Sequence, residues 1–150
     1  MSSNTEIAKL DDLIVTTIDS VKGYEHSATK AESSVFAELL TALAQERHSI
    51  VTMLQEQSRA LGGEPNEFGS AAATIHRRFE DIRLAIGGGD TAIVKEIERG
   101  ENYLKEEFER ALKDHTFSIA TRTTIERCFK IVAAGRIQIE QLDLELAANH

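Results

Sequence analysis

Several features that are scarce in this 150-residue chain exclude whole classes of protein. There is one cysteine, Cys128, so no disulfide can form within the chain, and a reducing compartment is expected. Cys128 precedes Phe129 in an apolar helical pattern, which favours a buried, inert thiol over a nucleophile. The one proline, Pro65, lies between helical patterns, and strict alternation of apolar and polar residues is missing. These absences predict an all-α chain.

The chain also lacks an excess of basic residues and lacks long apolar runs. Its 25 acidic and 17 basic side chains give a net charge of −8, which repels a phosphate backbone, so no nucleic-acid partner is expected. No apolar run approaches the roughly 20 residues of a membrane span. Residues 1–20 contain acidic side chains instead of the basic and apolar segments of a secretory leader. We therefore expect a cytoplasmic protein without a membrane partner.

Four long stretches carry apolar residues at alternating spacings of three and four, the period of an amphipathic helix in a bundle. They predict helices over about 3–30, 34–61, 90–113 and 119–146. The first helix is expected to begin at Ser3, because Ser3 and Glu6 have the spacing of a capping box. Ser34 and Asp90 are the expected N-caps of the second and third helices.

A segment too long for a hairpin loop, about 62–89, separates the second helix from the third. Pro65 prevents the second helix from continuing into it. A short fifth helix is predicted within this segment, over about 70–86, with one apolar side that would pack on the bundle or on a partner. That side consists of Ile75, Phe79, Ile82 and Ile86.

The order of these elements predicts an all-α fold of two antiparallel helical hairpins joined by a long crossover. A ferritin-like four-helix bundle has that connectivity, whereas an up-down-up-down bundle with short loops does not. At 150 residues the chain fits a single domain, 1–150, with the crossover at about 62–89.

Several short pieces of the sequence, taken in their order along the chain, point to a family resemblance. They are Gly23-Tyr24, the turn Leu61-Gly62-Gly63-Glu64-Pro65, then Gly69-Ser70, His76-Arg77 and Glu98-Arg99-Gly100-Glu101. With these pieces the chain resembles a family of small bacterial four-helix-bundle proteins, grouped as a domain of unknown function within the ferritin-like superfamily. The likeness spans nearly the whole chain. It implies a ferritin-like fold with a helical crossover, and it implies no particular reaction.

A ferritin-like di-metal centre needs a Glu from each of two helices and a Glu-x-x-His from each of the other two. No Glu-x-x-His occurs in this sequence, so no metal cofactor is predicted. The alternative is a degenerate or mononuclear site for iron or manganese. Its candidate ligands are four carboxylates of the predicted helices, Glu25, Glu46, Glu98 and Glu101.

Charged residues interrupt the apolar seams of the last three helices, at Arg47, Glu101 and Arg136. An arginine cannot lose its proton or ligate a metal, and buried charges must be paired. We therefore predict a structural polar layer in which Glu101 pairs with Arg136, and in which Glu98 or Glu25 pairs with Arg47. Such a layer would fix the register of the helices more than it stabilises the fold.

The sequence contains neither a nucleophile elbow nor a phosphate-binding loop, and no catalytic residue is predicted. The expected function is that of a non-catalytic bundle that acts through self-association or protein partners, as a stress-related or scaffold protein, with a homodimer favoured. Ile93, Leu144 and Leu146 are candidate surface residues for such contacts. The alternative is a ferritin-like metal-dependent oxidase or peroxide-consuming protein with an atypical carboxylate site.

Overall fold

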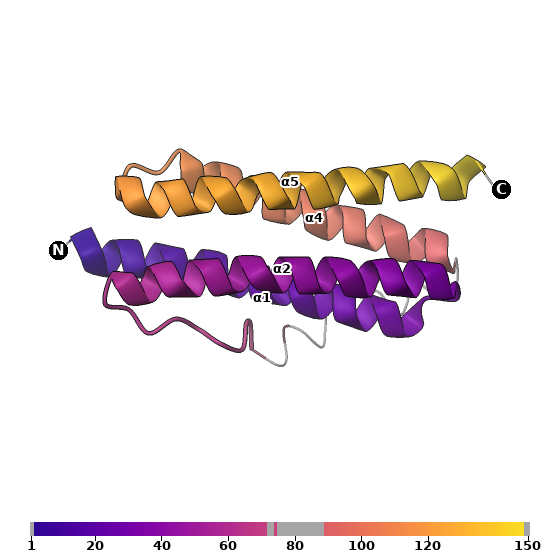
Figure 1. The fold of residues 1–150 in the computed structure, drawn as a ribbon, viewed down its shortest axis with the longest axis horizontal. Helices are drawn as coiled ribbons and strands as arrows, with labels where there is room; N and C mark the ends of the chain where they lie inside the picture. The colour runs from indigo at the N-terminus through magenta and orange to yellow at the C-terminus, as the bar shows by residue number, and fades with distance from the viewer. Residues whose placement is uncertain (1, 72–73, 75–88, 149–150) are drawn as a thin grey trace.

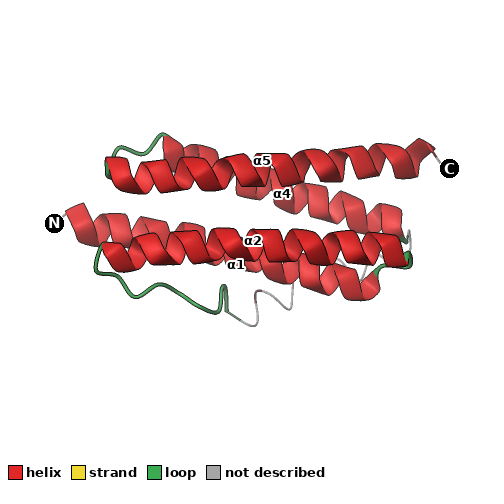
Figure 2. Ribbon diagram, in the orientation of Figure 1, coloured by secondary structure: helices red, strands yellow, loops and turns green. Residues whose placement is uncertain are grey.

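The structure of this protein is a computed structural model that describes residues 2–71, 74 and 89–148. Within that part of the chain it contains four α-helices and no β-strand (Figure 2). These helices are α1 (Ser2–Lys30), α2 (Ser34–Ala60), α4 (Asp90–Leu112) and α5 (Ile119–Ala148). The predicted all-α class and the four long helices are confirmed, and each boundary lies close to its predicted position.

The four helices form a bundle in which neighbouring helices are antiparallel (Figure 1). α1 packs against α2 and α4, and α5 packs against the same two helices, so α2 and α4 occupy opposite corners. α2 ends at one end of the bundle and α4 begins at the other, so these two helices run in the same direction. The end of α2 and the start of α4 therefore lie at opposite ends of the bundle.

The apolar seams of the helices build the core as two clusters. Cys128 is buried in one of them, and burial raises the pKa of its thiol to about 12, as expected for an inert cysteine. Ile93 is buried in the other cluster, so its predicted surface position is wrong. Leu144 is exposed and Leu146 is partly buried. In the described part of the chain, no helix combines the length and apolar character needed to cross a membrane.

The predicted N-caps of α2 and α4 are both wrong by one residue, because Ser33 occupies the cap position of α2 and Gly89 occupies that of α4. Ser33, not Ser34, caps α2, and its hydroxyl oxygen accepts a hydrogen bond from the backbone N–H of Phe36 at 3.2 Å. Asp90 is the first residue of α4 instead of its cap. The Asp90 carboxylate accepts hydrogen bonds from the backbone N–H groups of Glu32 and Ser33, at 2.7 and 3.0 Å. Asp90 thus joins the start of α4 to the α1–α2 turn.

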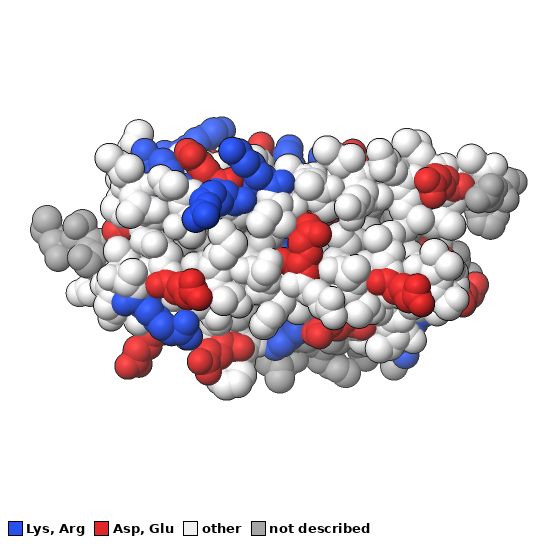
Figure 3. All heavy atoms as spheres, viewed as in Figure 1, with Lys and Arg blue, Asp and Glu red and all other residues white. Residues whose placement is uncertain are grey.

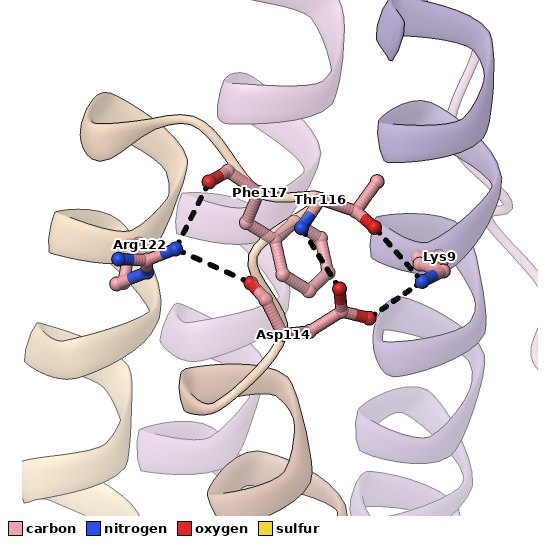
Figure 4. Close-up of polar contacts among 5 residues, drawn as sticks. All are labelled: Lys9, Asp114, Thr116, Phe117 and Arg122. Atoms are coloured by element: carbon pink, nitrogen blue, oxygen red, sulfur yellow. Dashed lines mark hydrogen bonds and ion pairs between the residues drawn. The ribbon is translucent and has the colours of Figure 1, made fainter.

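At the opposite end of the bundle, the turn between α4 and α5 is fastened to α1 (Figure 4). Lys9 Nζ donates to the Asp114 carboxylate at 2.6 Å and to the Thr116 hydroxyl at 3.0 Å. The hydrogen bond from Lys9, followed by those from Thr116, lowers the pKa of Asp114 to about 2. Arg122 in the first turn of α5 donates to the backbone carbonyls of Asp114 and Phe117, both at 3.3 Å.

Glu6 does not form the predicted capping box. α1 begins at Ser2, and the Glu6 carboxylate accepts hydrogen bonds from the backbone N–H and the hydroxyl of Ser118, at 3.0 and 2.8 Å. Burial alone would raise the pKa of Glu6, but hydrogen bonds from Thr121 and Ser118 outweigh it, and the pKa lies below its usual value. Glu6 therefore fastens α1 to the residue that precedes α5.

The described beginning of the crossover follows α1. Asp11 accepts a hydrogen bond from the backbone N–H of Asn66 at 2.7 Å, and Asp19 accepts one from the backbone N–H of Ser70 at 2.8 Å. Gly69 has a positive φ of 81°, and a Cβ there would lie 2.6 Å from Asp19 Oδ1, so this approach requires glycine. Outside the described residues lies the apolar side of the predicted fifth helix, Ile75, Phe79, Ile82 and Ile86.

Candidate functional site

An ion pair crosses the interior of the bundle from corner to corner. Arg47 on α2 and Glu101 on α4 make two hydrogen bonds, Nη1 to Oε1 at 2.7 Å and Nη2 to Oε2 at 3.0 Å. Their side chains are only 1% and 2% exposed. Since α2 and α4 occupy opposite corners, the long arginine side chain reaches across the bundle axis to the carboxylate.

Tyr24 on α1 contacts both members of the pair. Its hydroxyl donates to Glu101 Oε1 at 2.8 Å, and its ring centroid lies 5.4 Å from Arg47 Cζ, within the range of a cation–π contact. Arg47 Nη1 also donates to the hydroxyl of Ser20, one turn before Tyr24, at 3.1 Å. We call the three larger residues the Tyr24–Arg47–Glu101 cluster. Because its members come from α1, α2 and α4, the cluster couples three helices.

The fourth helix makes room for the cluster with a glycine. A Cβ at Gly135 on α5 would lie 3.0 Å from Arg47 Nη2, closer than side-chain atoms normally approach. The Arg47 fork is held in place by its two bonds to Glu101, so it cannot easily move away. Sequence reasoning missed Gly135. The available signal was a glycine beside Arg136 in an otherwise helical pattern, where its intrinsic helix propensity is poor.

The surroundings fix the protonation of the cluster. Burial and the negative charge of Glu101 raise the pKa of Tyr24 well above its usual value, so the phenol keeps its proton. Burial alone would lower the pKa of Arg47, but the charge and hydrogen bonds of Glu101 outweigh it, and the pKa of Arg47 is raised. Neither Tyr24 nor Arg47 therefore exchanges a proton near neutral pH, and the cluster offers no acid or base for catalysis through these two groups.

The predicted partners of the polar layer are wrong, although Arg47 and Glu101 are both interior. Glu101 binds Arg47 and not Arg136. Arg136 is half-buried at the edge of α5, where its Nε donates to Asn102 Oδ1 at 3.0 Å and its Nη1 lies 3.0 Å from Glu140 Oε1. Arg136 instead contacts Asn102, the exposed residue that follows Glu101 on α4.

Glu25 and Glu98, the other members of the predicted layer, do not pair with Arg47. Glu25 is exposed on α1. Glu98 is half-buried on α4 and shares a hydrogen bond with Asp143 on α5. That hydrogen bond, together with burial and the charge of Asp143, raises the pKa of Glu98 to about 7. The two carboxyl groups therefore share one proton below about pH 7. Sequence reasoning missed Asp143 because it lies off the apolar seam of α5.

The four candidate metal ligands do not form a centre. Glu101 is occupied by Arg47 and Tyr24, Glu25 is exposed, and Glu98 faces Asp143. Glu46 is half-buried beside the Arg47 cation, and its charge contributes to the raised pKa of Arg47. Among the described residues, no three His, Cys, Asp or Glu side chains lie together in a way that could hold a metal ion.

The fold and the cluster define a class: a protein whose described residues form four α-helices, with a bidentate ion pair between two of them in the interior. A model of the family described as "Domain of unknown function (DUF2383)" matches residues 5–114. The chain therefore belongs to this family, and the matched region includes Tyr24, Arg47 and Glu101 and ends before α5. No curated protein matches the sequence.

Proposed function

We propose that this protein is a metal-free, non-catalytic bundle of the ferritin-like class that acts in the cytoplasm by self-association, with a homodimer as the working form. The observation that carries the proposal is the bidentate Arg47–Glu101 pair in the interior. A guanidinium at this place supplies positive charge and five donors but no lone pair for a metal. Both oxygens of its carboxylate partner accept hydrogen bonds, Oε1 from Arg47 and Tyr24 and Oε2 from Arg47.

The path of the chain supports the ferritin-like class. α1 and α2 form one antiparallel hairpin, α4 and α5 form another, and α2 runs parallel to α4 (Figure 1). That arrangement requires one connection that spans the bundle, which distinguishes ferritin-like folds from bundles with short loops alone. In such folds, metal ligands project inward from facing helices, and here the inward positions contain the Tyr24–Arg47–Glu101 cluster.

Self-association is supported by large apolar side chains that the bundle itself leaves exposed. Apolar surface that contacts no other part of a protein is commonly used to bind a partner. In the described part of the chain, the most exposed of these side chains are Val35, Phe68, Tyr103, Ile119, Ile137 and Leu144. Three of them, Ile119, Ile137 and Leu144, lie on α5, and its outer side is considered further below.

Elemental analysis of the untagged protein, purified without chelator, tests the metal-free part of the proposal. The protein is analysed as purified and again after incubation with ferrous iron or Mn²⁺ and desalting. We expect metal well below one equivalent in the wild type and no change in Glu101→Gln. A near-stoichiometric metal content that falls in Glu101→Gln or Glu98→Gln would overturn the proposal. Sedimentation equilibrium of the same sample tests the homodimer separately.

The second candidate function is a ferritin-like metal-dependent oxidase or peroxide-consuming protein, with iron or manganese. The feature in its favour is the Glu98–Asp143 pair, in which a hydrogen bond between carboxyl groups of α4 and α5 raises the pKa of Glu98 to about 7. Such a pair could exchange its proton for a cation, with two oxygen ligands of the type that hard metals prefer. Loss of bound metal in Glu98→Gln alone would favour this candidate.

A further inference from the structure

α5 has two opposite faces, and only one of them is used by the bundle. Its inner face carries the buried residues Ile125, Cys128, Val132 and Ile139. Its outer face carries exposed residues at alternating spacings of three and four, so they form one stripe along the helix. We call this the α5 outer stripe, and it consists of Arg127, Lys130, Ala134, Ile137, Gln138, Gln141, Leu144 and Glu145.

The middle of the stripe is uncharged. Ile137 and Leu144 are 52% and 71% exposed, respectively, and the residues between Lys130 and Glu145 in the stripe are alanine, glutamine or aliphatic. Figure 3 views this side of the molecule, with Lys and Arg gathered over the first half of α5, an acidic group near its end, and uncharged surface between them. A solvated helix face normally carries charges along its whole length.

Charge along α5 changes sign at the middle of the helix. From Ile119 to Arg136 the helix carries four basic residues and one acidic residue, and after Arg136 the described helix has no basic residue. The acidic residues after Arg136 are Glu140, Asp143 and Glu145. Two copies of α5 placed parallel would set like charges against each other, whereas two antiparallel copies would set each basic half against an acidic half. With a net charge of −8 on each chain, two copies repel each other overall, and such local complementarity offsets part of that repulsion.

We propose that the α5 outer stripe binds the same stripe of a second copy of this chain, antiparallel, about a two-fold axis near Ile137 and Gln138. This inference rests on the self-association proposed above and names its surface. In this register Ile137 packs near Ile137 of the second copy, and Lys130 lies opposite Glu145 of the second copy. The contact is isologous, so each attractive pair occurs twice in the dimer.

The surface of a single helix is smaller than a standard protein interface, so the dimer should dissociate on dilution, with a Kd of about micromolar. Exposed ion pairs are screened by salt, so the dimer should also weaken as ionic strength rises. Both properties are measurable by sedimentation equilibrium over a range of concentrations of the full chain.

Charge reversal tests the antiparallel register. Lys130→Glu and Glu145→Lys each turn two attractive pairs into two repulsive ones, and each should raise the Kd by about tenfold. The double variant Lys130→Glu/Glu145→Lys restores opposite charges and should return the Kd to near the wild-type value. Both residues are exposed, so helix content by circular dichroism should not change. Arg99→Glu on α4, a residue with 76% side-chain exposure, changes the net charge as Lys130→Glu does and should leave the Kd within about twofold.

Ile137→Asp tests the apolar centre, because it places two carboxylates at the two-fold axis. We expect it to raise the Kd by about a hundredfold. A dimer that none of these variants changes would use another surface, which would overturn this inference and leave the proposed self-association intact. A chain that stays monomeric at millimolar concentration would overturn both. The metal-free part of the proposed function is decided independently by elemental analysis.

Discussion

Arg47 on α2 and Glu101 on α4 form a bidentate ion pair across the axis of the bundle, with Nη1–Oε1 and Nη2–Oε2 distances of 2.7 and 3.0 Å. Both side chains are almost fully buried. The attraction between two buried charges roughly offsets the cost of removing both from water, so such a pair adds little net stability. Its geometry is nevertheless specific. Because each hairpin supplies one member, the fork fixes how far one hairpin can slide along the other.

The two members of the pair should respond unequally to substitution. Glu101→Leu leaves a buried guanidinium that cannot lose its proton, and it should cost about 3–5 kcal/mol of unfolding free energy. Arg47→Met should cost less, because the Glu101 carboxyl left behind can take up a proton and become neutral. The double variant should be more stable than Glu101→Leu. Urea denaturation of the four proteins gives the coupling energy, and a value below about 0.5 kcal/mol would contradict a tight pair.

Tyr24→Phe should destabilise the protein without changing its fold. The variant keeps the ring over Arg47 but loses the hydrogen bond to a charged acceptor, which is worth about 1.5–3 kcal/mol. The control is Tyr103→Phe, since Tyr103 is half exposed and its variant should lie within about 0.5 kcal/mol of the wild type.

The ionisation of Tyr24 provides a second measurement. The chain has two tyrosines, so in Tyr103→Phe any tyrosinate absorbance comes from Tyr24. Because burial and Glu101 raise the pKa of Tyr24 well above its usual value, this absorbance should appear only as the protein unfolds in alkali. Tyrosinate formed while the helices remain intact would mean that Tyr24 is not held in the cluster.

Replacing a helical glycine by alanine should stabilise the protein at two positions, Gly100 and Gly23, but not at Gly135. Gly100→Ala should stabilise the protein by about 0.5–1 kcal/mol, because alanine is the better helix former and no atom lies within 4 Å of the added Cβ. Gly23→Ala is a second control for the same reason. Gly135→Ala should leave the stability unchanged or lower it, because the added Cβ would crowd Arg47 Nη2.

Thermal unfolding of these variants measures the difference. A stabilisation of Gly135→Ala equal to that of Gly100→Ala would mean that the Arg47 guanidinium can move away from α5. In the Arg47→Met background, Gly135→Ala should stabilise the protein about as much as Gly100→Ala does, because the crowded Arg47 nitrogen is no longer present.

The sequence predicted the helices well because a seam repeating at three and four residues depends only on the chain itself. It placed Arg47 and Glu101 on such seams, and both are buried. It could not select their partnership, because α2 and α4 meet across a diagonal that depends on the path of the crossover. The predicted N-caps of α2 and α4 were each one residue too late, and for Asp90 the reason is again a contact that the sequence does not show. Asp90 binds the backbone of the α1–α2 turn, a contact between segments far apart in sequence.

Gly135 and Asp143 illustrate the remaining limit of sequence reasoning. A glycine in a helix is interpreted as a flexible or weak position unless the neighbour that needs its space is known. An aspartate beside the apolar seam of α5 is interpreted as a solvated residue until Glu98 is found to face it. In both cases the signal is a distance between helices, and side-chain periodicity within one helix does not contain it.

The Glu98–Asp143 pair should make stability depend on pH in the range where most carboxyl groups do not titrate. Hydrogen bonding with Asp143 and burial raise the folded-state pKa of Glu98 to about 7, above that of the unfolded chain. The folded state therefore binds a proton that the unfolded state has lost, and stability falls as pH rises from about 4.5 to about 7. At this half-buried site the loss should be on the order of 1 kcal/mol after solvent screening.

Glu98→Gln supplies the control, because an amide can still donate to Asp143 but does not titrate. Its melting temperature should fall less than that of the wild type between pH 5 and pH 8, with a difference of about 2–4 °C. His26, whose pKa is lowered by burial and then by Lys30, titrates in both proteins, so the comparison isolates the carboxyl pair. Parallel pH profiles for the two proteins would mean that Glu98 and Asp143 are both ionised at neutral pH and that no proton holds α4 and α5 together there.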